Sequence, residues 1–205
     1  MMGSNRNKDS HHIMHLIEEG TIGAEIGVWK GSSSEQFLKR NPKMLYLVDP
    51  WACSGYDEAV EANDPTFSME AMLNNPKYVK LTKGKDEKSF DIYYDDVAAD
   101  IERRFGGLEN VTICRMPATQ WFDLSEDGPF LDWIYIDGDH SYTGAYNDLC
   151  NALKVVKEGG LIIGDDYKWG RPGDKGGVKK AANQWAEENG LTLEQFGENQ
   201  FVVRL

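Results

Sequence analysis

Short apolar runs alternate with longer segments of helical periodicity along most of the chain. The apolar runs end at Gly, Pro or Asp, and five of them predict buried strands, over residues 23–28, 44–48, 111–115, 133–136 and 161–163. The segments between them predict helices over residues 33–40, 89–105 and 141–157, and a fourth helix is predicted over residues 178–189. Strands that alternate with helices in this way are typical of βαβ units and a parallel sheet.

The C-terminus departs from that alternation. Residues 191–196 and 200–205 are two apolar segments separated only by Gly197, Glu198 and Asn199, which predicts a hairpin of two antiparallel strands. The pattern therefore indicates an α/β fold, with an open, mostly parallel sheet, helices on both faces and an antiparallel C-terminal edge hairpin. We expect one domain over residues 23–205, preceded by a lead-in helix or tail over residues 1–22.

Residues 52–85 interrupt the rhythm of strands and helices. The segment contains two prolines and two glycines, a short predicted helix over residues 67–73 and no clear strand. An insertion of this length after a strand is commonly a lid or a binding loop when it is ordered. A plain surface excursion is an equally acceptable interpretation.

Composition and charge exclude several classes of partner. The 205 residues carry a formal net charge of -12 with scattered basic residues, which argues against a nucleic-acid partner. Cys53, Cys114 and Cys150 lack the spacing of a zinc site or a disulfide framework, and a reducing cytoplasm fits them best. We find no apolar run that could cross a membrane and no signal peptide, so we expect a cytoplasmic protein with no membrane partner.

Charged side chains follow two of the predicted strands, at the point where each strand ends. Strand 133–136 is followed by Asp137, Asp139 and His140, and strand 161–163 by Asp165 and Asp166. In an open α/β sheet this edge faces the crevice where ligands bind. Carboxylates that converge there repel one another unless a cation or protons offset their charge, so the cluster predicts a functional site. Asp139 could alternatively do no more than cap the following helix.

Glycines and serines mark the turn from the first strand into the first helix. Gly27 and Gly31 permit positive φ and let a ligand lie against bare backbone, and the serines that follow, Ser32 to Ser34, can cap the helix. Asp49 follows about 20 residues later at the end of the second strand, where an acid can bind ribose hydroxyls, and Trp51 could flank a purine ring. Trp29 occupies the place of the central glycine in the dinucleotide fingerprint, which would crowd a pyrophosphate.

Taken together, these segments resemble the class I S-adenosylmethionine (SAM)-dependent methyltransferases, which have a Rossmann-like fold. The resemblance spans residues 23–205 and rests on Glu-x-Gly-x-x-x-Gly at 25–31, Val-Asp-Pro at 48–50, Asp-Gly-Asp-His-Ser-Tyr at 137–142 and Gly-Gly-Leu-Ile-Ile-Gly-Asp-Asp-Tyr at 159–167. The most similar subgroup contains small bacterial O-methyltransferases, akin to the macrolide-sugar and catechol enzymes. His140 replaces a lysine of the catechol type, and Asp166 replaces an asparagine, as in the sugar enzymes.

The resemblance implies a role for each of the matching residues. Glu25, Gly27, Gly31 and Ser32 would surround the methionine part of the cofactor, Asp49 would bind the ribose, and Trp51 and Asp137 complete the expected cofactor contacts. Asp137, Asp165 and Asp166 match the ligands that hold a magnesium ion in the cation-dependent enzymes. We expect His140 to act with Asp137 as the catalytic pair, because a histidine with a pKa of about 6.5 can accept a proton near neutral pH.

The predicted function is therefore metal-assisted O-methylation of a small hydroxylated acceptor with SAM as the methyl donor. Carboxylate oxygens suit Mg²⁺, and a bound divalent ion lowers the pKa of a coordinated hydroxyl. Cation-independent relatives keep acids at the same strand ends for other hydrogen bonds, so the metal is a separable part of the prediction. Two alternatives are a nicotinamide-dinucleotide oxidoreductase on a similar fold and a non-catalytic nucleotide-binding subunit. A homodimer is the default expectation for an oligomer.

Overall fold

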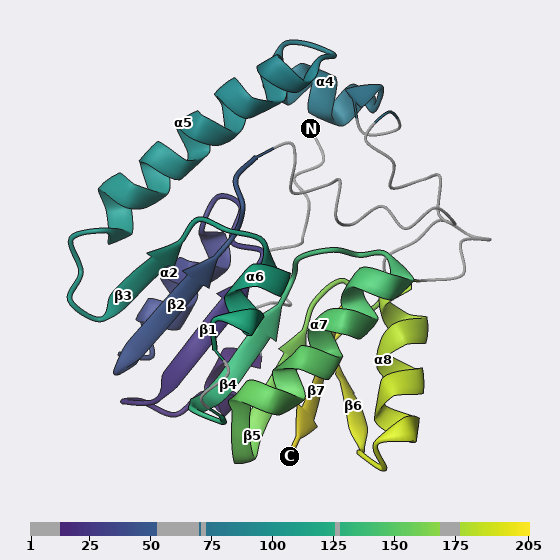
Figure 1. Cartoon of the computed structure of the whole chain (residues 1–205). Helices are drawn as coiled ribbons and strands as arrows, with labels where there is room; N and C mark the ends of the chain where they lie inside the picture. The colour runs from purple at the N-terminus through teal and green to yellow at the C-terminus, as the bar shows by residue number, and fades with distance from the viewer. Residues whose placement is uncertain (1–12, 53–69, 71–72, 126–127, 169–176) are drawn as a thin grey trace.

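Seven strands form one mixed sheet in the order β3-β2-β1-β4-β5-β7-β6 (Figure 1). The computed structural model describes residues 13–52, 70, 73–125, 128–168 and 177–205. The strands are β1 (Ile22–Ile26), β2 (Met44–Val48), β3 (Val111–Cys114), β4 (Leu131–Ile136), β5 (Val156–Gly164), β6 (Leu193–Phe196) and β7 (Gln200–Arg204). The first five pair in parallel, and β7 pairs antiparallel with both β5 and β6. The predicted mostly parallel sheet with an antiparallel C-terminal hairpin is thus confirmed.

Helices cover both faces of the sheet. Successive side chains of a strand point to opposite faces, so each central strand contributes to two separate cores. In β4, Ile134 and Ile136 belong to one core, whereas Trp133 and Tyr135 belong to the other. The first core is completed by α6 (Ala118–Asp123), α7 (Tyr142–Val155) and α8 (Gly177–Glu188), and the second by α2 (Ser32–Leu38) and α5 (Glu87–Phe105). The predicted helices on both faces are confirmed.

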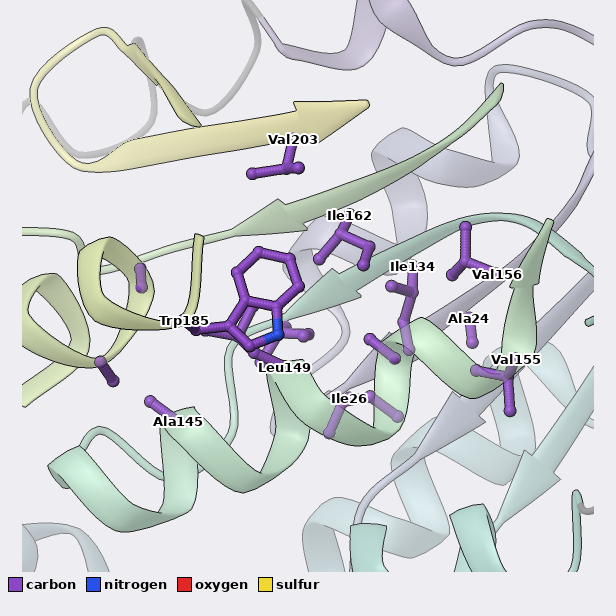
Figure 2. Close-up of a cluster of buried hydrophobic side chains, with 14 of the residues drawn as sticks. Ala24, Ile26, Ile134, Ala145, Leu149, Val155, Val156, Ile162, Trp185 and Val203 are labelled. Carbon is purple, nitrogen blue, oxygen red and sulfur yellow. The ribbon is translucent and has the colours of Figure 1, made fainter. Parts of the chain in front are cut away.

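Figure 2 shows how the first core is filled. Trp185 of α8 lies between the sheet and α7, close to Ile162 and Leu149, and none of its surface is exposed. Val203 of β7 covers the same region from the antiparallel edge of the sheet. Because α7 and α8 share this core, the two helices and β7 form one support for the loops at their ends.

The lead-in before β1 contributes to the second core. It contains one turn of 3-10 helix, η1 (Met14–Leu16), and Ile13 and Ile17 on either side of that turn are buried. The exposed ring of His15 lies 5.7 Å from the ring of Phe196 in β6. Residues 13–17 therefore pack against the sheet, whereas the rest of the predicted lead-in up to residue 12 lies outside the described residues.

The boundaries of several elements differ from the predicted ones. The predicted helix 141–157 ends at Val155, and β5 begins at Val156 instead of Leu161, because the Val155 carbonyl accepts a hydrogen bond from the Phe130 N–H and Val156 pairs with Leu131. Helix α6, which buries Trp121 and Phe122, was not predicted.

The segment 52–85 contains a helix that the sequence pattern did not predict. Helix α4 (Pro76–Thr82) begins after Asn75, whose side chain accepts a hydrogen bond from the Lys77 N–H, and proline stands at its first position. The predicted helix over residues 67–73 lies mostly outside the described residues, which include only Glu70 and Leu73 of it. The lid therefore stays a prediction. Among the described residues, no helix is long and apolar enough to cross a membrane.

Candidate active site

The parallel ladder places three residues side by side just beyond the carboxyl ends of the central strands. The Gly27 N–H donates to the Val48 carbonyl (2.9 Å), and the Asp137 N–H donates to the Ile26 carbonyl (2.8 Å). In the same way the Asp165 N–H donates to the Ile136 carbonyl (3.0 Å). The glycine turn and the two acidic strand ends therefore meet at one edge of the sheet, as the sequence predicted.

Two glycines of the turn are required for different reasons. Gly27 has a φ of 87°, and a Cβ there would lie 2.2 Å from the Asp137 carbonyl oxygen, so the glycine turn touches the β4 end through bare backbone. Gly31 has a φ of 69°, and a Cβ there would lie 2.8 Å from side-chain atoms of Ile101 and Phe105. Gly31 therefore faces α5, and close packing of that helix explains this glycine better than the predicted cofactor contact does.

Asp49 ties the glycine turn to the segment after β2. Its Oδ2 accepts from the Trp29 N–H (2.8 Å) and its Oδ1 accepts from the Trp51 N–H (2.7 Å). These bonds hold both tryptophans at positive φ, 45° for Trp29 and 41° for Trp51. Burial raises the pKa of the Asp49 carboxyl, although the backbone N–H groups and Arg115 oppose that shift. Asp49 thus organises the loop in addition to standing where the sequence predicted a ribose contact.

The ring of Trp51 is placed differently from the prediction. Only 1% of Trp51 is exposed, and its indole N–H donates to the Trp29 carbonyl (2.8 Å). In this arrangement Trp51 supports the loop and offers no open face to a purine. The exposed ring at this edge belongs to Trp29, which is 39% exposed and has the ammonium groups of Lys30 and Lys77 at 5.0 and 5.7 Å.

Two arginines that sequence reasoning missed hold the same loops. On α5, Arg104 donates to the Lys30 carbonyl (2.7 Å) and to the Gly31 carbonyl (3.4 Å), and it pairs with Glu35 (2.7 Å). After β3, Arg115 donates to the Trp51 carbonyl (3.0 Å). Both residues act on backbone carbonyls far away in sequence, so no local motif marks them.

Glu25 and Ser34 form a buried pair beneath the glycine turn. The Ser34 hydroxyl donates to a Glu25 carboxylate oxygen, and both residues are at most 1% exposed. Burial raises the pKa of Glu25 well above its usual range. The predicted serine cap is wrong, since α2 begins after Gly31 without a side-chain cap and Ser32 is exposed. Ser34 instead joins the helix to β1.

Three side chains converge beyond β4 and β5. Asp137, His140 and Asp166 each offer a ligand atom, and these atoms lie within 4.8 Å of one another. The His140 Nε2 is 3.2 Å from Asp137 Oδ1 and 3.5 Å from Asp166 Oδ2. The side chains are partly shielded, with 22% of His140, 30% of Asp137 and 24% of Asp166 exposed. This cluster can bind a hard cation or exchange a proton.

Electrostatics favours one shared proton in this cluster in the absence of a cation. Burial raises the pKa of Asp137 to about 6, the hydrogen bond with His140 opposes this rise, and repulsion by Asp165 and Asp166 adds to it. Burial alone would lower the pKa of His140, but the contact with Asp137 and the charge of Asp166 raise it above its usual value. The titrations of Asp137 and His140 are therefore coupled.

Asp165 does not belong to that cluster. One of its carboxylate oxygens accepts a hydrogen bond from the Tyr135 hydroxyl, and the other accepts from the Asp166 N–H (2.8 Å). The predicted ligand set of Asp137, Asp165 and Asp166 is therefore only partly assembled, since the cluster contains two of these aspartates and not Asp165.

The N-cap of α7 is Ser141 and not Asp139, which instead holds the capping serine in place. Asp139 accepts hydrogen bonds from the Ser141 N–H and hydroxyl (both 2.8 Å), and the Ser141 oxygen in turn accepts from the Gly144 N–H (3.0 Å). A Cβ on Gly144 would lie 2.0 Å from an Asp139 oxygen, so the cap closes tightly over the helix. This fixes the loop that carries His140.

A narrow hollow lies beside the cluster. It is lined by the loop 137–140, by Ala145 and Leu149 of α7, by Val178 of α8, and by Ile136, Asp165 and Phe201. Its lining thus combines apolar side chains with the carboxylates of Asp137, Asp139 and Asp165 and the imidazole of His140. Residues 169–176, which follow Lys168, lie outside the described residues.

Comparison with known proteins assigns this fold and site to a family. A family model described as a methyltransferase domain matches residues 24–167, which include the glycine turn and both acidic strand ends. The chain belongs to this methyltransferase domain family. A curated relative, an uncharacterized protein of Acanthamoeba polyphaga mimivirus, is 26% identical over 145 residues, which cover 70% of this chain and 50% of that protein. The chain therefore spans about half the length of this curated relative.

Solved structures agree with the family at the level of the fold. An O-methyltransferase from Bacillus cereus, in complex with SAH, has 16% identity and a TM-score of 0.58, over 100% of this chain and 83% of that one. The O-methyltransferase TomG from Streptomyces achromogenes, in complex with SAM, has 16% identity and a TM-score of 0.57. The match covers 100% of this chain and 81% of that one. The methyltransferase family does not favour the alternative of a nicotinamide-dependent oxidoreductase.

Proposed function

We propose that the protein transfers a methyl group from SAM to a hydroxyl oxygen of a small acceptor, assisted by a divalent cation. The observation that carries the proposal is the meeting of two half-sites at one sheet edge. The glycine turn with Asp49 lies on one side, and Asp137, His140 and Asp166 lie on the other. The similar O-methyltransferases with SAH or SAM support the same assignment.

The cofactor half-site has the donor and acceptor capacity that SAM requires. An ionised carboxylate offers about four acceptor positions. Asp49 uses part of this capacity on backbone N–H groups, which leaves positions for ribose hydroxyls. Gly27 brings bare backbone to the Asp137 carbonyl, so a ligand that follows this turn would reach the second half-site directly. Glu25 stays a candidate contact of the methionine part, and in the present arrangement it supports the turn from below.

The second half-site suits a hard divalent cation. Mg²⁺ typically takes one or two protein carboxylates and keeps positions for water or substrate oxygens. Asp137 and Asp166 supply two such carboxylates, both within 3.5 Å of His140 Nε2. When bound, the cation would lower the pKa of an acceptor hydroxyl. It would also offset the repulsion that raises the pKa of Asp137.

His140 is the best-placed group to receive the acceptor proton. Its Nε2 lies within 3.5 Å of both carboxylates, and the hydrogen bonds of Asp139 to Ser141, the N-cap of α7, hold its loop. With a cation held by the carboxylates, the imidazole would be the neighbouring group that accepts the hydroxyl proton as general base.

Titration calorimetry with SAM and with its demethylated product tests the cofactor assignment. We expect saturable binding of both, and an absence of binding at millimolar concentration would contradict it. Adding Mg²⁺ and then a chelator during a methyl-transfer assay tests the metal separately. Turnover that is insensitive to the chelator would contradict the role of the cation and leave the methyl-transfer activity as proposed. Binding of SAM without turnover on any hydroxylated acceptor would favour the non-catalytic alternative.

Replacing Arg104 by methionine is expected to weaken SAM binding about tenfold, because it removes charged hydrogen bonds worth roughly 1.5 kcal/mol from the turn that receives the cofactor. Calorimetry at fixed pH measures the change. Arg103→Met is the matched control, since Arg103 is exposed and pairs with Asp100 on its own helix. Equal affinities for SAM in the two variants would show that Arg104 does not order the turn.

A further inference from the structure

We propose that Tyr135 and Gln200 position the cation site from inside the sheet, and that they act through Asp165. In this assignment Asp165 is a positioning residue and Asp137 and Asp166 are the carboxylate ligands. The inference rests on the proposed metal-assisted function and concerns how this chain builds the second half-site.

A continuous chain of hydrogen bonds leads from β7 to the site. The Gln200 side-chain amide donates to the Tyr135 hydroxyl (3.0 Å), and that hydroxyl donates to Asp165 Oδ2. The remaining oxygen of Asp165, Oδ1, accepts from the Asp166 N–H (2.8 Å). One carboxylate oxygen of Asp165 thus accepts a hydrogen bond from the core residue Tyr135, and the other accepts one from the backbone N–H of Asp166.

The last bond of this chain determines where Asp166 points. Asp166 has a φ of 52°, in the left-handed region that residues other than glycine adopt sparingly. Such a conformation persists where the surroundings specify it, and here the Asp165 carboxylate holds the Asp166 N–H. In this turn Asp166 Oδ2 comes to 3.5 Å from His140 Nε2, which places it in the cluster with Asp137.

The polar pair has no evident purpose in the core itself. Tyr135 is 0% exposed and stacks edge-on against Phe37 at 5.0 Å, and Gln200 is 2% exposed. The Gln200 Oε1 atom is buried and has no hydrogen-bond partner among the described residues. A buried unpaired carbonyl is unfavourable, so an apolar residue would serve the core at least as well. The hydrogen bond from the Gln200 amide to the Tyr135 hydroxyl offsets part of this cost, and through Tyr135 it connects Gln200 to Asp165.

This arrangement separates two adjacent aspartates by function. Substitution at a ligand should remove cation binding, whereas substitution at a group that orients a ligand typically weakens it by about ten- to a hundredfold. The effects of Tyr135 and Asp165 should also be non-additive, because one acts through the other.

Calorimetric titration with Mn²⁺ alone, as a probe of the divalent site, tests the assignment on the whole chain. We expect Tyr135→Phe and Asp165→Ala each to weaken binding about tenfold, and Asp166→Ala to weaken it more than about a hundredfold. The double variant Tyr135→Phe, Asp165→Ala should bind as Asp165→Ala alone does. Thermal unfolding of each variant confirms that it is folded.

Tyr146→Phe is the matched control, because the Tyr146 hydroxyl also donates to a carboxylate, that of Glu188, away from the site. Its Mn²⁺ affinity should equal that of the unaltered protein. Additive losses in the double variant, an unchanged affinity in Tyr135→Phe, or equal losses in Asp165→Ala and Asp166→Ala would overturn the inference while leaving the metal-assisted function. A failure of the unaltered protein to bind Mn²⁺ or Mg²⁺ at millimolar concentration would overturn both.

Discussion

Replacing His140 by alanine is expected to lower kcat for methyl transfer by a factor of about 10² to 10⁴, the range that a positioned general base contributes. The reason is geometric, since His140 Nε2 lies 3.2 Å from Asp137 and 3.5 Å from Asp166, next to where an acceptor oxygen would share their cation. Affinities for SAM and for Mg²⁺ should stay within about threefold, because the carboxylates and the glycine turn are unchanged. Single-turnover kinetics and calorimetry measure these quantities separately.

His15→Ala is the control for this experiment. His15 is exposed and contacts Phe196 of the edge strand β6, and it belongs to neither half-site, so its loss should leave kcat unchanged. A collapse of Mg²⁺ affinity in His140→Ala would show that the imidazole is a ligand and not the base. Unchanged turnover would remove His140 from catalysis, and the cluster would then serve binding alone.

The elements that the sequence predicted well are those with a strong periodic signal. The apolar runs of β1, β2 and β4 end at glycine or aspartate, and the C-terminal hairpin has a short turn between apolar flanks. The boundary between α7 and β5 was missed because Val155, Val156 and Lys157 fit both a helix end and a strand start. A tertiary hydrogen bond from Phe130 decides between them.

The candidate site shows the same division between local and distant signals. Aspartates after strands can be read from the sequence, since parallel strands share one edge. The side chains that hold them cannot be read in this way. Arg104 binds the Lys30 carbonyl across 74 positions, and Gln200 reaches Tyr135 across 65. Gly31 shows that a motif glycine can be required by a packed helix.

Asp148 is a further acid that no motif marks, and it makes the stability of the protein depend on pH. It lies on α7 beneath the loop that carries Gly138, and only 6% of it is exposed. Burial, together with repulsion by Asp139, raises its pKa to about 7. The folded state therefore holds this proton more tightly than the unfolded state, where the pKa is about 3.9. Its ionisation consequently destabilises the fold as pH rises from about 4 to 7.

Asp148→Asn should remove this dependence. Each pKa unit corresponds to about 1.4 kcal/mol. The raised pKa of Asp148 therefore lowers the free energy of unfolding by about 1.5 kcal/mol at pH 5 and by about 4 kcal/mol at pH 8. The gain in free energy of unfolding should thus be about 2.5 kcal/mol larger at pH 8 than at pH 5. Urea denaturation at both pH values measures it, with the exposed Asp96→Asn on α5 as control. Equal gains at the two pH values would mean that Asp148 is already ionised in the folded protein at pH 5.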